Sequence, residues 1–165
     1  MAHRRHVPAQ VRSVELLERC GYEDSFGVSV SARRPPGAWA RVIVDSAPRW
    51  LTWFIRVAQK HLLGLELARA DLAHPLGWMV IREDEQAVVL AAEGPGGEAR
   101  IVGTTPPGEL AVTTHARFDT RRSRALWWLL APVHRRIVCH LLDNAVERES
   151  LYWGRPPGTP SSSFT

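Results

Sequence analysis

The side chains best suited to chemistry in this chain are His134, Arg135 and Arg136, in the run ALWWLLAPVHRRIV. An imidazole beside fixed positive charge could hold the anionic group of a ligand or exchange a proton with it. At helical spacing Trp127, Ala131 and His134 fall on one flank, so the imidazole would stand beside an aromatic wall. The alternative is that His134 bonds a carbonyl or carboxylate near the sheet while the arginines are solvated or pair with the acidic run EDE.

A second set comprises His115 and Asp119, with Arg117 between them. An imidazole and a carboxylate could together perform acid–base chemistry. Strand alternation, however, places His115 and Arg117 on the face opposite Leu110 and Phe118, which predicts that they point outward. A structural role is therefore favoured for this set.

Other catalytic and metal-binding patterns are missing from the sequence. The serines form no GxSxG elbow, the carboxylates form no close pair, and GPGGEAR lacks the helix context and lysine of a phosphate loop. Cys20 and Cys139 lie far apart, with no CxxC pair and no histidine at finger-like spacing. We therefore expect no metal site, no disulfide framework and no cofactor. The HRRH arm could bind a metal or an anion, but a flexible leader is favoured.

Composition indicates one folded domain. The 165 residues are 45% hydrophobic and 23% charged, which excludes a disordered chain. The net charge of +4 comes from arginine, because Lys60 is the only lysine. Arginine suits phosphate and carboxylate partners, but no basic helix or nucleic-acid signature accompanies it, so no nucleic-acid binding is expected.

The same reasoning predicts a cytoplasmic protein without a membrane span. The N-terminus, MAHRRHVPAQ, has no apolar region or cleavage site of a secretory signal. The most hydrophobic stretch, WLTWFIRVAQKHLLGL, is interrupted by Arg56 and Lys60 and is shorter than the roughly 20 apolar residues that a span requires.

The order of predicted elements begins with a strand in DSFGVSV, where Phe26, Val28 and Val30 alternate with small or polar residues. A short helix or turn over Val11–Cys20 would precede it. Two helices should follow, over about residues 38–46 and 48–65, because apolar residues recur there at steps of three and four and Pro48 separates them.

Four extended runs come next, separated by the turn signals EDE, GPGG and TPPGE, which predicts an antiparallel meander. In its last strand one face should meet the core; its members are Leu110, Val112, Thr114, Ala116 and Phe118. A helix from residue 121 to 149, roughly 40 Å long at 1.5 Å per residue, should cross the sheet, with a kink near Trp128 caused by Pro132. Residues 1–10 would form a flexible arm, 11–150 the domain, and 151–165 a disordered tail.

This order of strand, two short helices, meander and long C-terminal helix resembles the helix-grip, START-like (SRPBCC) superfamily, which includes Bet v-type and polyketide cyclase-like proteins. In detail the chain is similar to an uncharacterised domain-of-unknown-function branch. The matching pieces are YEDSFGVSV, WARVIVDSAPRW, LLGLEL, LGWMVIREDEQAVVLAAE, THARFDTRRSRALWWLLAPVHRRIV and LLDNA. The resemblance implies an α+β domain whose curved antiparallel sheet of five to seven strands wraps a long helix around a ligand cavity. Five clear strands and a tight connection at Gly94–Gly97 suggest that this cavity is small.

Within that fold, three hypotheses stay open, with a monomer or homodimer expected. The favoured hypothesis is a protein that binds a small apolar molecule between sheet and helix, either neutral or carrying an anionic group. The expected pocket residues are Trp78, Phe118, Trp127 and Leu130 as walls, with His134 and Arg135 at the polar end. A cyclase- or dehydratase-like enzyme would use His134 as acid–base and Arg135 to stabilise negative charge. A protein-interaction module would use exposed tryptophans, either Trp50 and Trp53 with Phe54, or the Trp127–Trp128 pair.

Overall fold

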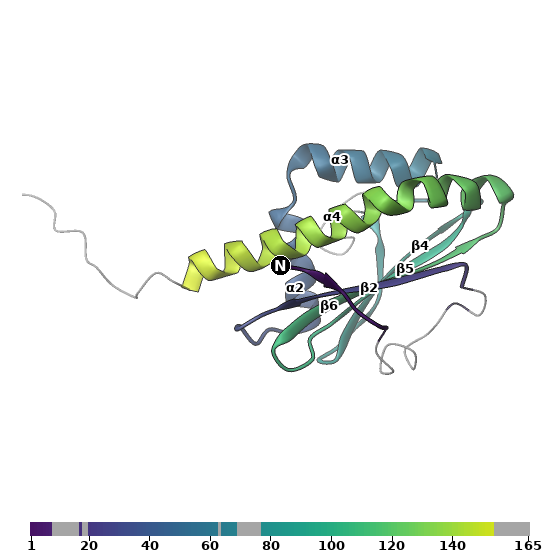
Figure 1. Ribbon diagram of the computed structural model, residues 1–165. Helices are drawn as coiled ribbons and strands as arrows, with labels where there is room; N and C mark the ends of the chain where they lie inside the picture. Colours follow the sequence, from purple (N-terminus) through teal and green to yellow (C-terminus); the bar gives the residue numbers. More distant parts are fainter. Residues whose placement is uncertain (8–16, 18–19, 63, 69–76, 154–165) are drawn as a thin grey trace, which may run out of the picture.

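The computed structural model describes residues 1–7, 17, 20–62, 64–68 and 77–153. The fold is α+β, with a curved open sheet of six antiparallel strands, two shorter helices after the first long strand, and a long C-terminal helix (Figure 1). The predicted fold class is therefore confirmed. In chain order the elements are β1 (His3–Arg4), β2 (Tyr22–Ser29), α2 (Pro36–Ser46), α3 (Arg49–Val57), the π-helical turn η1 (Ala58–Leu62), β3 (Met79–Glu83), β4 (Ala87–Gly94), β5 (Gly97–Thr104), β6 (Glu109–Phe118) and α4 (Arg121–Trp153).

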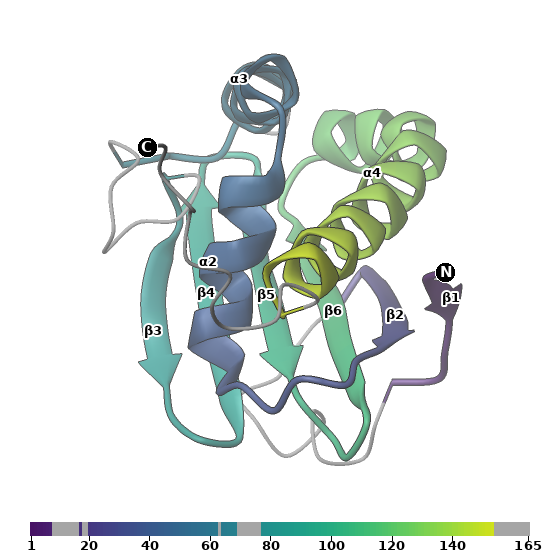
Figure 2. The same cartoon turned by 90° about the vertical axis from the view of Figure 1, so that its left-hand side faces the viewer.

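The strands lie in the order β1-β2-β6-β5-β4-β3. The strands β3 to β6 form the predicted meander. Strand β2 extends it by pairing with β6, from Tyr22↔Ala116 to Ser29↔Glu109. Helices α2 and α4 lie side by side over the same face of this sheet, as Figure 2 shows, and α3 runs alongside α4. The helices therefore cover one face of the sheet (Figure 2).

Local chemistry explains the hairpin turns. Oδ1 of Asp84, in the EDE turn, accepts hydrogen bonds from the backbone N–H groups of Gln86 (2.8 Å) and Ala87 (2.9 Å), which closes the turn between β3 and β4. Gly97 and Gly108, in the next two turns, adopt φ values of +144° and +75°, which residues with a side chain rarely take. One irregularity remains, because the pairing of β3 with β4 shifts between Val80 and Arg82 to form a bulge.

The two faces of the sheet differ in what covers them. The face beneath α4 carries the predicted core residues of β6, and two clusters of buried apolar side chains lie there, one around Trp127 and one around Trp39 and Leu142. The opposite face holds a smaller cluster of Ala87, Val89 and Val102, with Val7 packed against it.

His115 lies on this opposite face, as alternation predicts, but the expectation that it points into solvent is wrong. Only 2% of the residue is exposed. The physical reason is that both faces of the central strands are covered, so that Thr113 and Ala111 on the same face of β6 are buried too.

Helix α4 is one continuous element with Pro132 inside it, and Figure 1 shows that its axis bends along its length. Thr120 caps its start, since Oγ1 accepts a hydrogen bond from the N–H of Ser123 at 3.0 Å. The two adjacent tryptophans point in different directions, since Trp127 is 7% exposed and Trp128 is 58% exposed, so they do not form the exposed pair of the interaction hypothesis. The helix thus turns one indole toward the sheet and the other toward solvent.

Several expectations fall at the ends of the chain. Of the short helix expected over Val11–Cys20, residues 17 and 20 alone are among the described residues. The disordered tail was expected to begin at residue 151, but α4 continues to Trp153, and residues 154–165 lie outside the described residues. Within the arm 1–10, His3–Arg4 forms the edge strand β1, and the N–H of Ala2 donates to Asp143 of α4 at 2.7 Å. In the part of the chain that the structure describes, no helix is both long and apolar enough to cross a membrane.

Candidate functional site

Four of the six predicted site residues meet in one cluster beneath the first half of α4. Trp78 and Trp127 are buried in it, and Phe118 and Leu130 pack against it. The ring centroids of Trp127 and Phe118 lie 5.9 Å apart, and the Trp127 ring meets the edge of the Tyr22 ring at 4.8 Å. Within the cluster, Trp127 therefore packs directly against the rings of Tyr22 and Phe118.

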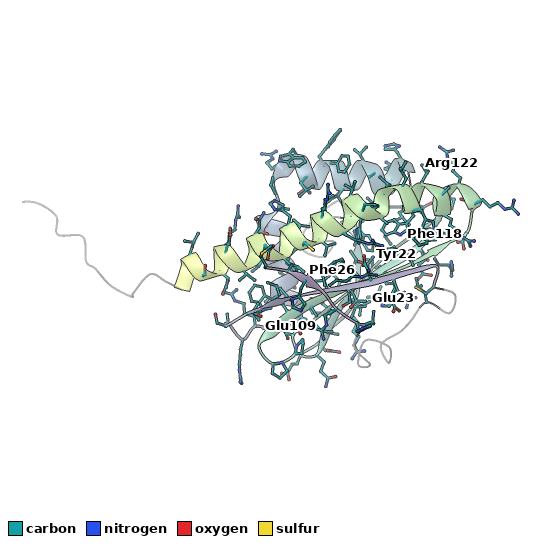
Figure 3. All side chains as sticks on the ribbon, viewed as in Figure 1. Tyr22, Glu23, Phe26, Glu109, Phe118 and Arg122 are labelled. Carbon is teal, nitrogen blue, oxygen red and sulfur yellow. The ribbon has the colours of Figure 1, made fainter. Side chains whose placement is uncertain are left out.

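His134 and Arg135 come together with polar residues from β2 and β6. The Tyr22 hydroxyl donates to Oδ2 of Asp24, and Nε of Arg135 donates to the Tyr22 oxygen at 3.3 Å. Nε2 of His134 lies 3.3 Å from Oγ1 of Thr114 and 3.8 Å from Oδ1 of Asp24. These residues meet because register places Tyr22, Asp24 and Thr114 on the face below α4, where Figure 3 shows Tyr22 between helix and sheet. We call these five residues the polar cluster.

The polar cluster contains one buried carboxyl group, that of Asp24. Its side chain is fully buried, and its Oδ1 has no hydrogen-bond partner among the described residues. A buried carboxylate needs opposite charge nearby, which Arg135 supplies at 3.9 Å and His134 can supply when protonated. Arg135 therefore directs its Nε at Asp24 and Tyr22, so its charge is paired within the polar cluster although the side chain is 37% exposed.

Tyr22 is held in its neutral form. Burial, followed by the hydrogen bond to Asp24, raises the pKa of Tyr22 to about 12, although Arg135 acts in the opposite direction. The phenol is thus a hydrogen-bond donor to the carboxylate throughout the physiological range. The Tyr22 hydroxyl positions Asp24 and does not ionise at neutral pH.

An apolar cleft lies next to the polar cluster. Two adjoining pockets, of about 120 Å³ and about 100 Å³, share Ile101, Val138 and Leu141 in their walls. The larger pocket separates α3 and η1 from α4, and the smaller one lies between α2, α4 and the sheet. The larger is walled by Phe54, Ala58, Gln59, Leu130, His134 and Ile137, among others.

Among the predicted site residues, Trp127, Leu130 and His134 line this cleft. Trp78 does not line it and lies in the core instead. Its indole Nε1 donates to Oε1 of Gln59 at 3.1 Å, and Gln59 is itself part of the cleft wall. Phe118 lies on the far side of Trp127, next to a separate pocket of about 20 Å³.

The outer surfaces of α3 and α4 carry exposed apolar side chains. Trp50 and Trp53 of α3 are well exposed, and so are Trp128 and Leu129 of α4, but none of these four lines the cleft. The ring of Trp128 lies 6.3 Å from that of Tyr22 instead. Phe54, which is 39% exposed, does line the larger pocket, so it is an apolar side chain at which the cleft meets solvent.

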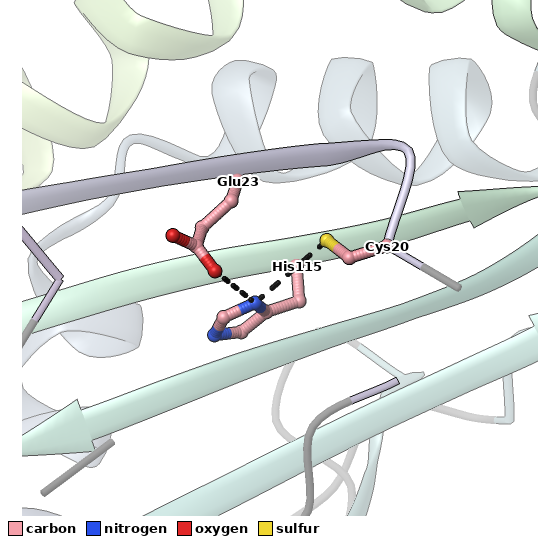
Figure 4. A group of neighbouring side chains, drawn as sticks. All are labelled: Cys20, Glu23 and His115. Atoms are coloured by element: carbon pink, nitrogen blue, oxygen red, sulfur yellow. Dashed lines mark hydrogen bonds and ion pairs between the residues drawn. The ribbon is translucent and has the colours of Figure 1, made fainter. Parts of the chain in front are cut away.

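The second predicted set does not assemble. Arg117 donates from Nε to Asp119 at 3.1 Å, whereas His115 turns toward Cys20 and Glu23 on the neighbouring strand segment (Figure 4). Burial lowers the pKa of His115, and the nearby Glu23 carboxylate opposes that shift. His115 and Asp119 are therefore not an acid–base pair.

Sequence reasoning missed Tyr22 and Asp24. The signal was present, because alternation in YEDSFGVSV puts Asp24 on the same face as Phe26 and Val28, which the strand prediction already assigned inward. A carboxylate at an inward position requires a partner, and α4 offers His134 and Arg135.

Comparison of the chain with protein-family models, with curated proteins and with solved structures finds no match. The molecule is thus defined by its own geometry: an open antiparallel sheet, a long helix across it, and an apolar cleft whose wall includes one histidine of a buried polar cluster. The resemblance to helix-grip proteins stays a prediction.

Proposed function

We propose that this protein binds a small apolar molecule in the cleft between α3, α4 and the sheet. The observation that carries the proposal is the pair of adjoining pockets, which have almost wholly apolar walls and reach solvent beside the partly exposed Phe54. Apolar pockets with few polar groups are the usual form of small-molecule sites. The cysteines are free, which supports the expected cytoplasmic setting.

Pocket size limits the ligand. A dry apolar cavity of about 150 Å³ accommodates a molecule the size of benzene. Pockets of about 120 Å³ and about 100 Å³ therefore suit one ring each, or a medium-length acyl chain running through both.

Two polar groups can orient the ligand. His134 and Gln59 both line the larger pocket, and both can hydrogen-bond to a hydroxyl or carboxylate. Arg135 is not part of the lining, because it faces Asp24. The ligand we favour is therefore a neutral alcohol or ring compound, and we expect an anionic ligand to bind more weakly.

Binding can be tested with 1-octanol and octanoate, followed by calorimetry and by native mass spectrometry of the purified chain. Ala58→Phe fills the larger pocket from α3, whereas Ala125→Phe places the same bulk on the exposed start of α4. We expect A58F to weaken octanol binding at least about tenfold and A125F to change it less than about twofold. Equal binding by both variants, or none by the wild type, contradicts the proposal.

A second candidate is a cyclase- or dehydratase-like enzyme that uses His134. The observation in its favour is the buried Asp24, which lies 3.8 Å from Nε2 and can stabilise an imidazolium. Since Nε2 faces Asp24 and Thr114, Nδ1 is the nitrogen left for a substrate proton. The test is turnover of a β-hydroxy-carbonyl compound by the wild type, by His134→Gln and by the exposed-surface variant Trp128→Ala. Turnover that is lost in H134Q but kept in W128A would favour the enzyme over the binding protein.

A third candidate is an interaction module that uses the exposed tryptophans Trp50, Trp53 and Trp128. It predicts a homodimer in light scattering that dissociates in the double variant Trp50→Ala, Trp53→Ala. A concentration-independent monomer would eliminate self-association.

A further inference from the structure

Three potential metal ligands from separate parts of the chain converge on the face of the sheet opposite the cleft. They are Cys20, which immediately precedes β2, Glu23 on β2 and His115 on β6. The pairing Glu23↔His115 in the β2–β6 register sets two of them directly opposite each other. One donor atom of each lies within 4.8 Å of the other two.

Both neighbours approach the same nitrogen of His115, as Figure 4 shows. Nδ1 lies 3.4 Å from Oε2 of Glu23 and 3.9 Å from Sγ of Cys20. In a nucleophilic cysteine triad, the thiol and the carboxylate bond to different nitrogens of the imidazole, so that a proton can pass through the ring. Convergence on a single nitrogen does not permit that relay, but it is the arrangement of ligands around a common ion.

Two of the three separations are close to those of a tetrahedral zinc site, and the third, between Sγ of Cys20 and the Glu23 carboxylate, is within 4.8 Å. Bond lengths of about 2.3 Å to sulfur and about 2.0–2.1 Å to nitrogen and oxygen place the sulfur and nitrogen ligands about 3.6 Å apart and the nitrogen and oxygen ligands about 3.4 Å apart. The observed distances are 3.9 Å and 3.4 Å. Side-chain rotations alone can close the remaining gap, because Cys20 and Glu23 are both exposed.

The state of His115 supplies an independent reason for a ligand. The residue is 2% exposed, its Nε2 has no hydrogen-bond partner among the described residues, and its Nδ1 points at the other two side chains. A buried polar ring with such weak contacts costs free energy. An ion bound to Nδ1 would give that nitrogen a coordination bond in place of its contacts of 3.4 Å and 3.9 Å, while Nε2 would stay without a partner among the described residues.

Charge and donor type select the ion. A thiolate and a carboxylate together neutralise a divalent cation, and a set of sulfur, nitrogen and oxygen donors suits Zn²⁺ better than Mg²⁺ or Ca²⁺. We propose that Cys20, Glu23 and His115 form a Zn²⁺ site. Binding releases the thiol proton that Cys20 now donates to the carbonyl oxygen of Tyr22 at 2.8 Å.

The site can be tested on the full chain by equilibrium dialysis against Zn²⁺ with metal analysis, and by Co²⁺ titration, in which a thiolate ligand produces a near-ultraviolet charge-transfer band. Cys20→Ser and Glu23→Gln change exposed side chains and should fold. We expect one Zn²⁺ per wild-type chain, and an affinity at least about tenfold lower in each variant, since even outer-shell changes cost that much.

Matched controls are Cys139→Ser, which removes the other free thiol, and Glu85→Gln, an exposed carboxylate in the turn after β3. Both should keep wild-type affinity and the Co²⁺ band. The double variant His3→Asn, His6→Asn tests the arm. Absence of uptake by the wild type, a band that survives in C20S, or binding lost only with His3 and His6 would each overturn the proposal.

Discussion

The fully buried carboxylate of Asp24 on β2 lies 3.8 Å from Nε2 of His134 on α4, and this pair joins the helix to the sheet beside the cleft. The contact crosses 110 positions of sequence, and Tyr22, Thr114 and Arg135 surround it. The ring that could address a ligand is therefore also the ring that lies against a buried carboxyl group. Ligand binding and the stability of α4 on the sheet should depend on the same side chain.

We expect Asp24→Asn to lower the free energy of unfolding by about 1–3 kcal/mol, because the buried donors around it lose their anionic acceptor. In a double-mutant cycle with His134→Gln, the coupling should be about 0.5–3 kcal/mol. Urea unfolding of the four proteins measures it. The surface control Asp45→Asn should stay within about 0.5 kcal/mol of the wild type. A coupling of zero would show that the two side chains do not interact.

Tyr22 should make stability fall at alkaline pH. Its pKa is about 12 in the folded protein against 10.0 for a free tyrosine, so between these values the unfolded state releases a proton that the folded state keeps. The contribution is complete below pH 10 and is lost as the pH rises toward 12, by about 2–3 kcal/mol in all. Tyr22→Phe should remove this part of the pH dependence. Parallel alkaline profiles for both proteins would contradict the shift.

Adjacent tryptophans on α4 provide a test of packing. Trp127→Ala should cost about 3–5 kcal/mol, because it empties the centre of the aromatic cluster. Trp128→Ala removes an exposed ring of equal size from the next position and should cost less than about 1 kcal/mol. Denaturant unfolding followed by far-ultraviolet circular dichroism measures both. Similar losses in the two variants would mean that the helix is rotated about its axis.

Two glycines test the hairpin turns. A Cβ at Gly97 would stand 2.0 Å from the carbonyl oxygen of Arg117, at a φ of +144°, so we expect Gly97→Ala to cost more than about 2 kcal/mol. Gly108 has a φ of +75° and no atom within 4 Å of its Cβ position, so Gly108→Ala should cost only about 1 kcal/mol of backbone strain. Thermal unfolding ranks the two. A greater loss at Gly108 would refute the geometry of the β4–β5 turn.

Local signals in the sequence were sufficient for most of the fold. The turn runs EDE, GPGG and TPPGE separate β3 to β6 because they hold residues suited to tight turns, and the periodicity of 121–149 predicts α4 without tertiary information. Strand β1 could not be predicted, since two residues have no periodicity and become a strand only by pairing with Phe26 and Gly27 of β2.

The candidate sites were less accessible, because they depend on contacts between distant residues. The direction of His134 follows from helical spacing, but its partner Asp24 depends on which strand lies beneath α4. The same is true of Cys20 and His115, which are 95 positions apart and meet only through the β2–β6 register. Spacing rules for zinc ligands detect sites within one hairpin or finger and have no means of finding this one.

The bulge between Val80 and Arg82 lies in β3, the outermost strand of the sheet on that side. A regular edge would present an even row of backbone donors and acceptors, on which the strand of another molecule could continue the sheet. Here the spacing of that row is interrupted at Ile81, and the charged Arg82 and Glu83 follow at once. The molecule can thus keep apolar side chains such as Met79 exposed on its last strand without becoming a template for fibrous stacking.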